Sequence, residues 1–282
     1  MLLQFDVYSG NNNPTWQLPA SISKKIIELT GDLGLLERQG QSAFPARLGY
    51  RGLRIVLPAE IATKYRISPW INLSADLFGH STLVRELASI TRHVGFLGIH
   101  ELQKLLDRIV PLLQRASTPP PLKVAAGPQF GPCKFEMLPF EPRPWNDAAF
   151  KPKNNCYAYA SNKRALYSEK PQPGIGSGKK YRFCTGPDVA LASRRDGAHE
   201  VNDCFEESEA PRMLVALVIW PNEDYHWYRK HPDCWGHKPG STDARNTDNS
   251  SKVIIDPQTC DRGPYTDFYG YMLIPKSQKV AA

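Results

Sequence analysis

Three consecutive prolines interrupt the chain near its middle and limit what it can fold into. Pro119–Pro121 begin a proline-rich stretch that extends to Pro144. Proline fixes φ and lacks a backbone N–H, so this stretch is stiff and suits neither a helix interior nor a central strand. Because 282 residues are enough for two ordinary domains, we predict an N-terminal domain at 1–117, a linker at 118–144 and a second domain at 145–282.

The composition is that of a folded protein. Hydrophobic residues make up 41% of the chain and charged residues 22%, which is enough apolar material for a core. No apolar run approaches the ~20 residues of a membrane span, and the start, MLLQFDVYSG, lacks the features of a secretory signal. We therefore expect a soluble protein that is cytoplasmic or exported without a classical signal peptide.

The net charge of +7 is spread along the chain. The first 140 residues carry +5 and the remainder +2, without a dense block of lysine and arginine. Diffuse charge of this kind does not indicate specific nucleic-acid recognition. The six cysteines permit three disulfides, but without a secretion signal we expect mostly reduced thiols.

Hydrophobic periodicity predicts an α+β fold for the N-terminal domain. The expected elements are strands at Leu2–Ser9 and Tyr50–Leu57 and helices at Ser21–Leu36, Thr82–Ile90 and Ile99–Leu113, the last of them kinked or ended by Pro111. This region has no obvious catalytic cluster. We expect it to serve targeting or binding, including contact with a protein partner.

The C-terminal domain is predicted to combine a short helix with an antiparallel sheet. The helix is expected within Asn154–Asn162 and an irregular loop at Pro171–Gly178. Strands are expected at Met213–Trp220, Tyr225–Lys230, Cys234–Lys238, Val253–Ile255 and Tyr269–Ile274.

A cysteine at the start of the short helix is the sharpest chemical feature. The helix dipole and unpaired N–H groups favour the thiolate of Cys156. An imidazole must then take the thiol proton, and His226, at the start of a strand, is the best candidate. His237, on the returning strand, is predicted to lie beside His226 and orient it, with Asp256 as the alternative.

The order of these residues resembles papain-like cysteine hydrolases of the NlpC-like and CHAP type, which act on bacterial cell walls. The resemblance covers roughly residues 154–271 and rests on the pattern NNCYAYA, HWYR and WGHKPG. It implies a papain-like α+β domain with Cys156 as nucleophile, His226 as base and His237 as orienting residue, without metal or cofactor. The chain departs from the pattern in its long segment 161–212 and in lacking a small residue after the base histidine.

The favoured function is therefore a thiol-dependent hydrolase of amide bonds in a peptide or a peptidoglycan stem. A transferase or deamidase using the same Cys-His pair is one alternative. The other is a non-enzymatic protein- or glycan-binding module stabilised by disulfides or zinc.

Two further patterns in the C-terminal domain suggest other sites, one for zinc and one for phosphate. Zinc accepts cysteine and histidine ligands, and His226, His231, Cys234 and His237 fall within 12 residues, although not at a standard finger spacing. The glycines of Gly174–Gly178 superficially suggest a phosphate cradle, but no Lys-Ser/Thr follows at the required spacing. A loop near a binding groove fits this segment better.

Overall fold

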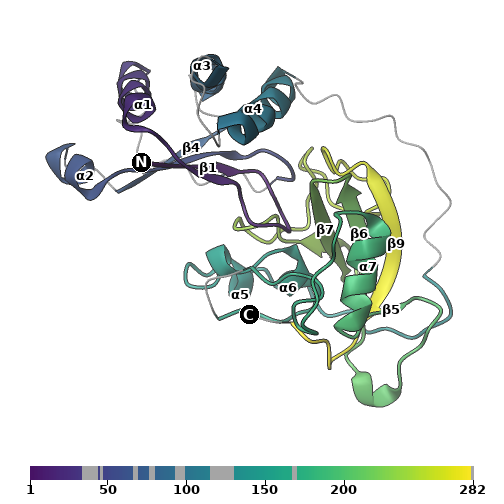
Figure 1. Ribbon diagram of the computed structural model, residues 1–282. Helices are drawn as coiled ribbons and strands as arrows, with labels where there is room; N and C mark the ends of the chain where they lie inside the picture. Colours follow the sequence, from purple (N-terminus) through teal and green to yellow (C-terminus); the bar gives the residue numbers. More distant parts are fainter. Residues whose placement is uncertain are drawn as a thin grey trace. The chain divides into compact units, whose positions relative to one another are not determined.

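The computed structural model is that of an α+β protein with antiparallel sheets, as predicted (Figure 1). It describes residues 1–33, 44, 47–65, 69–75, 80–92, 99–114, 130–166 and 170–280. The chain divides into two units. Unit 1 comprises Met1–Val7, Asn13–Pro45 and Tyr50–Thr118, and unit 2 comprises Tyr8–Asn12, Ala46–Gly49 and Pro119–Ala282. Residues 118–129 of the predicted linker lie outside the described residues, whereas 130–144 belong to unit 2.

Unit 1 is a four-stranded antiparallel sheet with helices packed on it. The strands run in the order β2-β1-β3-β4, and Figure 1 shows α1, α3 and α4 on the same side of the sheet. Alternate strand residues such as Leu3, Phe5 and Ile55 are buried, as a sheet covered on one face requires. The elements are β1 (Leu2–Asp6), β2 (Thr15–Gln17), α1 (Ala20–Asp32), β3 (Gly52–Val56), α2 (Ala59–Tyr65), β4 (Trp70–Ser74), α3 (His80–Arg92) and α4 (Ile99–Gln114).

The two strands and three helices predicted for this region are confirmed, with shifted ends. The strands β2 and β4 and the helix α2 were not predicted; β2, with three residues, and α2, with seven, are too short to display a period. Pro111 does not end α4, which continues to Gln114. The last three residues of the predicted helix at Ser21–Leu36 lie outside the described residues.

Unit 2 is built on a five-stranded antiparallel sheet in the order β5-β9-β6-β7-β8. The central strand β6 pairs with β7 on one side and β9 on the other. The helical elements are α5 (Arg143–Asn146), η1 (Lys151–Lys153), α6 (Cys156–Ala160), α7 (Gly186–Arg195) and η2 (Glu207–Glu209). The strands are β5 (His199–Glu200), β6 (Met213–Trp220), β7 (Asp224–Lys230), β8 (Trp235–His237) and β9 (Asp267–Ile274).

Both faces of this sheet are covered, which explains the continuous apolar run of β6. One face, with Val215 and Leu217, packs against α6 and α7. The other, with Leu214 and Ala216, packs against residues from loops around the sheet, such as Ile254. A strand buried on both faces needs apolar side chains at every position rather than at alternate ones.

Unit 2 corrects two expectations. The segment Val253–Ile255 is not a strand, because only an isolated bridge joins Val253 to Thr247. The helix α7 was not predicted, although Thr185 caps it by accepting from the Asp188 N–H and a proline follows in its first turn. Its apolar side contains small alanines, which weakens the periodic signal.

One disulfide, Cys133–Cys204, ties residues 71 positions apart, while the other four cysteines are free. It joins the extended segment after Phe130 to the loop that follows β5. Within the described residues, no helix has the length and apolar character needed to cross a membrane.

Candidate functional site

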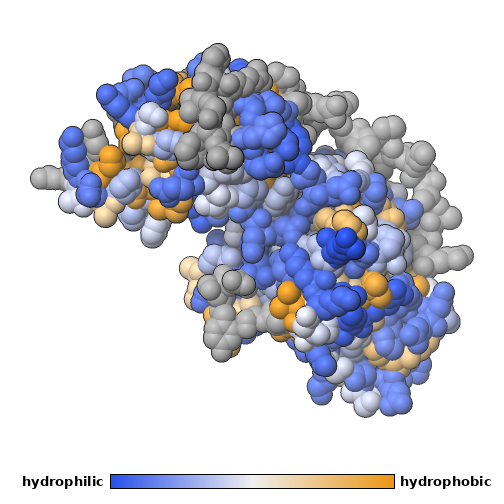
Figure 2. Space-filling model, in the orientation of Figure 1, coloured by the Kyte–Doolittle hydropathy of each residue, from blue (hydrophilic) through white to orange (hydrophobic). Residues whose placement is uncertain are grey.

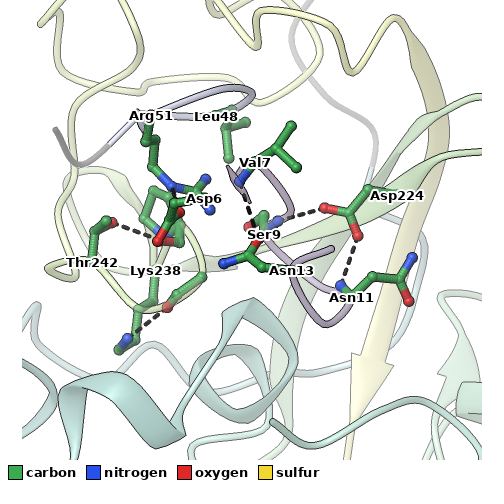
Figure 3. Close-up of polar contacts among 12 residues, drawn as sticks. Asp6, Val7, Ser9, Asn11, Asn13, Leu48, Arg51, Asp224, Lys238 and Thr242 are labelled. Atoms are coloured by element: carbon green, nitrogen blue, oxygen red, sulfur yellow. Dashed lines mark hydrogen bonds and ion pairs between the residues drawn. The ribbon is translucent and has the colours of Figure 1, made fainter. Parts of the chain in front are cut away.

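A buried carboxylate at the start of β7 holds the turn Tyr8–Asn12 within unit 2 (Figure 3). Asp224 accepts backbone N–H groups from Ser9 at 2.5 Å, Gly10 at 3.0 Å and Asn11 at 2.8 Å. The Tyr265 hydroxyl donates to the same carboxylate at 2.5 Å. Burial raises the pKa of Asp224, and these donors act in the opposite direction because they stabilise the ionised form. The turn is thereby fixed through its backbone.

Gly10 is needed where this turn meets β7. Its carbonyl accepts from Asn155 Nδ2 at 2.9 Å and Gln172 Nε2 at 2.7 Å. A Cβ atom at this position would lie 2.5 Å from the Tyr225 ring and 2.7 Å from the Tyr225 carbonyl oxygen. Only glycine permits so close a backbone approach.

The predicted nucleophile begins α6, as expected, but its environment disfavours a thiolate. Asn155 caps the helix by accepting from the Ala158 N–H at 3.1 Å, and Cys156 is fully buried. Its sulfur donates to the Tyr225 carbonyl at 3.9 Å. Burial, together with the negative charge of Asp224, raises the pKa of the Cys156 thiol to about 12. Desolvation outweighs the short helix, so the thiol stays protonated at neutral pH.

The predicted neighbourhood of the two histidines is confirmed. His226 Nε2 lies 2.9 Å from His237 Nδ1, and His237 Nε2 lies 2.9 Å from the Thr247 carbonyl oxygen. The other ring nitrogen of His226 lies 2.5 Å from the Ser9 hydroxyl. Both imidazoles are buried. Burial lowers the pKa of His237 to about 3, helped by the positive charge of Arg245.

Two neighbours of opposite hydrogen-bonding character face the outer ring nitrogen of His237. The Thr247 carbonyl can only accept, whereas Arg245 Nε, 3.3 Å from the same His237 Nε2, can only donate. His226 Nε2 faces His237 Nδ1 and His226 Nδ1 faces the Ser9 hydroxyl, so each ring nitrogen of His226 has a hydrogen-bonding partner. The Ser9 hydroxyl also interacts with the Cys156 thiol. Ser9, His226, His237 and Thr247 thus form a row of hydrogen-bonding groups, with the Cys156 thiol beside Ser9 at one end.

Asp256 does not join this row. Its carboxylate accepts from the Tyr271 hydroxyl at 3.1 Å and from the Gln258 N–H at 2.9 Å, in the turn before Cys260. His237 therefore takes the place beside His226, and Asp256 is engaged elsewhere. The catalytic roles predicted for Cys156, His226, His237 and Asp256 are not tested by these contacts and stay predictions.

The side chains predicted as possible zinc ligands make hydrogen bonds to different groups instead of converging on one point. His231 contacts the Tyr159 hydroxyl at 2.8 Å and the Leu138 carbonyl at 2.7 Å. Cys234 accepts from Asn246 Nδ2 at 3.7 Å. Among the described residues, no group of three or more histidine, cysteine or acidic side chains is arranged to hold a metal ion.

Ser9 and Asp224 make key contacts in the candidate site, and neither was predicted from the sequence as a site residue. Ser9 lies 217 positions before His226 and is assigned to unit 2 only by the fold. The signal available for Asp224 was its place two residues before His226 at a strand start, and for Ser9 the turn sequence SGNNNP. Neither pattern specifies its partner.

Fold and site together define an α+β protein in which Cys156, His226 and His237 are buried among other polar groups. Over 134 residues the chain is 46% identical to "Insoluble matrix shell protein 1" of Ruditapes philippinarum. The matched region covers 47% of this chain and 87% of that protein. The chain belongs to the family of this insoluble matrix shell protein. No family model matches the chain, and no solved structure matches it.

This relationship corrects the predicted class of protein. The prediction of a hydrolase, in particular a thiol protease or amidase, is wrong, because the relative is a matrix shell protein. The physical reason for the error is that a helix-initial cysteine and a strand histidine can also be buried and hydrogen-bonded to other core groups, as Cys156 and His226 are. The likeness in layout to papain-like, NlpC-like and CHAP-type proteins is not tested and stays a prediction, as does the transferase or deamidase alternative.

The raised pKa predicts a thiol that resists alkylation. We expect iodoacetamide at pH 8 to label Cys156 at least a thousandfold more slowly in the native chain than in urea, because a pKa of about 12 leaves roughly one thiolate in ten thousand. Site-resolved mass spectrometry measures this rate, with the same cysteine in the urea-unfolded chain as the comparison. Fast native labelling of Cys156 that falls in His226→Ala would contradict this description.

Proposed function

We propose that this protein is a non-enzymatic structural component of an extracellular matrix, in which it binds other matrix components. The observation that carries the proposal is the 46% identity to an insoluble matrix shell protein over most of that protein's length. Of the functions considered from the sequence, this agrees with the non-enzymatic binding module.

Two structural features support this proposal. Ser9, Cys156 and His226 are each 0% exposed, so the polar row stabilises the interior and offers no surface to a substrate. The Cys133–Cys204 bridge suits an oxidising compartment, where disulfides persist. We therefore infer that the chain is exported, and that one disulfide and buried hydrogen bonds stabilise unit 2.

Fractionation of the source tissue tests this proposal. We expect an antibody raised against the purified chain to detect it in the residue left after extraction with buffered salt and detergent, and its release by denaturant. Actin and a cytosolic dehydrogenase serve as markers of the cellular fraction. Recovery of the protein with those markers in the first buffer extract would refute a matrix role.

A further inference from the structure

A short basic and aromatic segment lies between the glycine-rich loop and α7. Residues 179–183 read Lys-Lys-Tyr-Arg-Phe, and residues 179–195 as a whole carry five basic side chains and one acidic side chain. The net charge of these 17 residues is +4, whereas that of residues 141–282 as a whole is +2. In Figure 2 the surface around α7 is mainly hydrophilic, with isolated hydrophobic groups within it.

Hydrogen bonds hold the backbone of this segment and of the glycine-rich loop before it. Asp196, which is 1% exposed, accepts from the N–H groups of Gly174 at 2.6 Å and Ser177 at 2.9 Å. Arg195 Nη2 donates to the Lys179 carbonyl at 2.7 Å. The Phe183 N–H donates to Asp188 at 3.0 Å. A surface fixed in this way loses little conformational entropy when a ligand binds.

The cations of the segment are available to an external anion. Lys179, Lys180 and Arg182 are exposed, and across the described ranges no carboxylate lies within 4.0 Å of their charged groups. Arg194 differs, because Glu200 lies 3.4 Å from it. Three like charges within four residues repel one another, and an anionic ligand relieves that repulsion.

Aromatic rings alternate with these cations. The Lys180 ammonium lies 4.8 Å from the Tyr181 ring centre, and the Arg182 guanidinium lies 4.9 Å from that of Phe183. Tyr181 is anchored, since its hydroxyl binds Asn11 and its ring packs edge-on against Tyr225. Phe183 is 54% exposed. An exposed ring beside cations can pack against the apolar C–H face of a sugar while the cations pair with its acidic substituents.

We propose that residues 179–183 and the adjoining surface of α7 bind an anionic polysaccharide, whose acidic groups pair with Lys179, Lys180 and Arg182 and whose sugar ring packs on Phe183. This inference rests on the proposed matrix function and names the class of matrix component. An acidic polypeptide satisfies the cations equally well but has no rigid apolar ring face for Phe183. The sugar polymer therefore uses both features of the surface.

Binding of the full chain to three immobilised polymers tests this inference by biolayer interferometry. The polymers are dextran sulfate, uncharged dextran and polyaspartate. We expect dextran sulfate to bind best, with affinity that falls as salt rises, and dextran to bind negligibly. The triple variant Lys179→Gln/Lys180→Gln/Arg182→Gln should bind dextran sulfate at least tenfold more weakly. Phe183→Ala should lose about threefold on dextran sulfate and nothing on polyaspartate.

The matched control removes three exposed charges elsewhere in unit 2. Lys134→Gln/Lys252→Gln/Lys276→Gln should change the affinity less than twofold, and circular dichroism should show that every variant is folded. Equal losses in the two triple variants, or polyaspartate binding as tight as that of dextran sulfate, would overturn the inference. If the protein is found in the insoluble tissue fraction but does not bind dextran sulfate, this inference alone is refuted. If it is found in the soluble extract, the proposed function is refuted.

Discussion

Replacing Asp224 by alanine is expected to lower the free energy of unfolding of unit 2 by about 4 kcal/mol. The change leaves three backbone N–H groups, those of Ser9, Gly10 and Asn11, without their acceptor. Each buried orphan donor costs about 1–3 kcal/mol. The Tyr265 hydroxyl loses its partner as well. Asp224→Asn should cost about half as much, because its amide keeps one accepting oxygen.

Guanidinium unfolding followed by tryptophan fluorescence measures this effect, since four of the six tryptophans lie in unit 2. Asp233, an exposed acidic residue in the β7–β8 turn, provides the control. Asp233→Ala should change the free energy of unfolding by less than about 0.5 kcal/mol. Similar stabilities for the Asp224 and Asp233 variants would show that the turn 8–12 does not depend on this carboxylate.

Loss of the Cys133–Cys204 bridge is the second large effect. The bridge closes a loop with a sequence separation of 71 residues, and the chain-entropy model gives about 4 kcal/mol for such a loop. The segment that it holds also contributes packing, because the Phe130 ring contacts Trp235 and Tyr271. We therefore expect the double variant Cys133→Ala/Cys204→Ala to unfold at clearly lower guanidinium concentration than the wild type.

The reducing agent provides an internal comparison for this prediction. With tris(2-carboxyethyl)phosphine present in the unfolding series, the wild type should approach the midpoint of the double variant, which itself should not respond. Cys260→Ala removes a free thiol and should keep the response to reductant. A wild-type midpoint that is the same with and without reductant would show that the bridge contributes nothing to stability.

Much of the fold of unit 2 was predictable, because its central strands have strong signals. The run Met213–Trp220 matches β6 residue for residue, and the turn after His231 brought β8 back beside β7 as predicted. Short elements with few apolar residues, such as α7, carry no comparable signal. Their boundaries depend on contacts with the sheet, which a single sequence does not specify.

The candidate site shows the same division. The spacing of His226 and His237 around a tight turn predicted their contact correctly. The burial of Cys156 could not be predicted, because it depends on Tyr225 and on the turn from residues 8–12. A helix-initial cysteine has a low pKa only when solvent or a cation stabilises the thiolate. The local sequence specified that Cys156 begins a helix, which favours a low thiol pKa. Tertiary packing buries the thiol and raises its pKa instead.

The turn Tyr8–Asn12 has a consequence for how the protein is made. It emerges from the ribosome more than two hundred residues before Asp224, which accepts hydrogen bonds from its backbone. It also emerges well before Asn155 and Gln172, whose side-chain amides donate to the Gly10 carbonyl. Unit 2 therefore contains contacts of very high sequence separation, of the kind that slows folding. Its core closes only after β7 has been synthesised, with the nascent N-terminal segment supplying a piece that no C-terminal fragment contains.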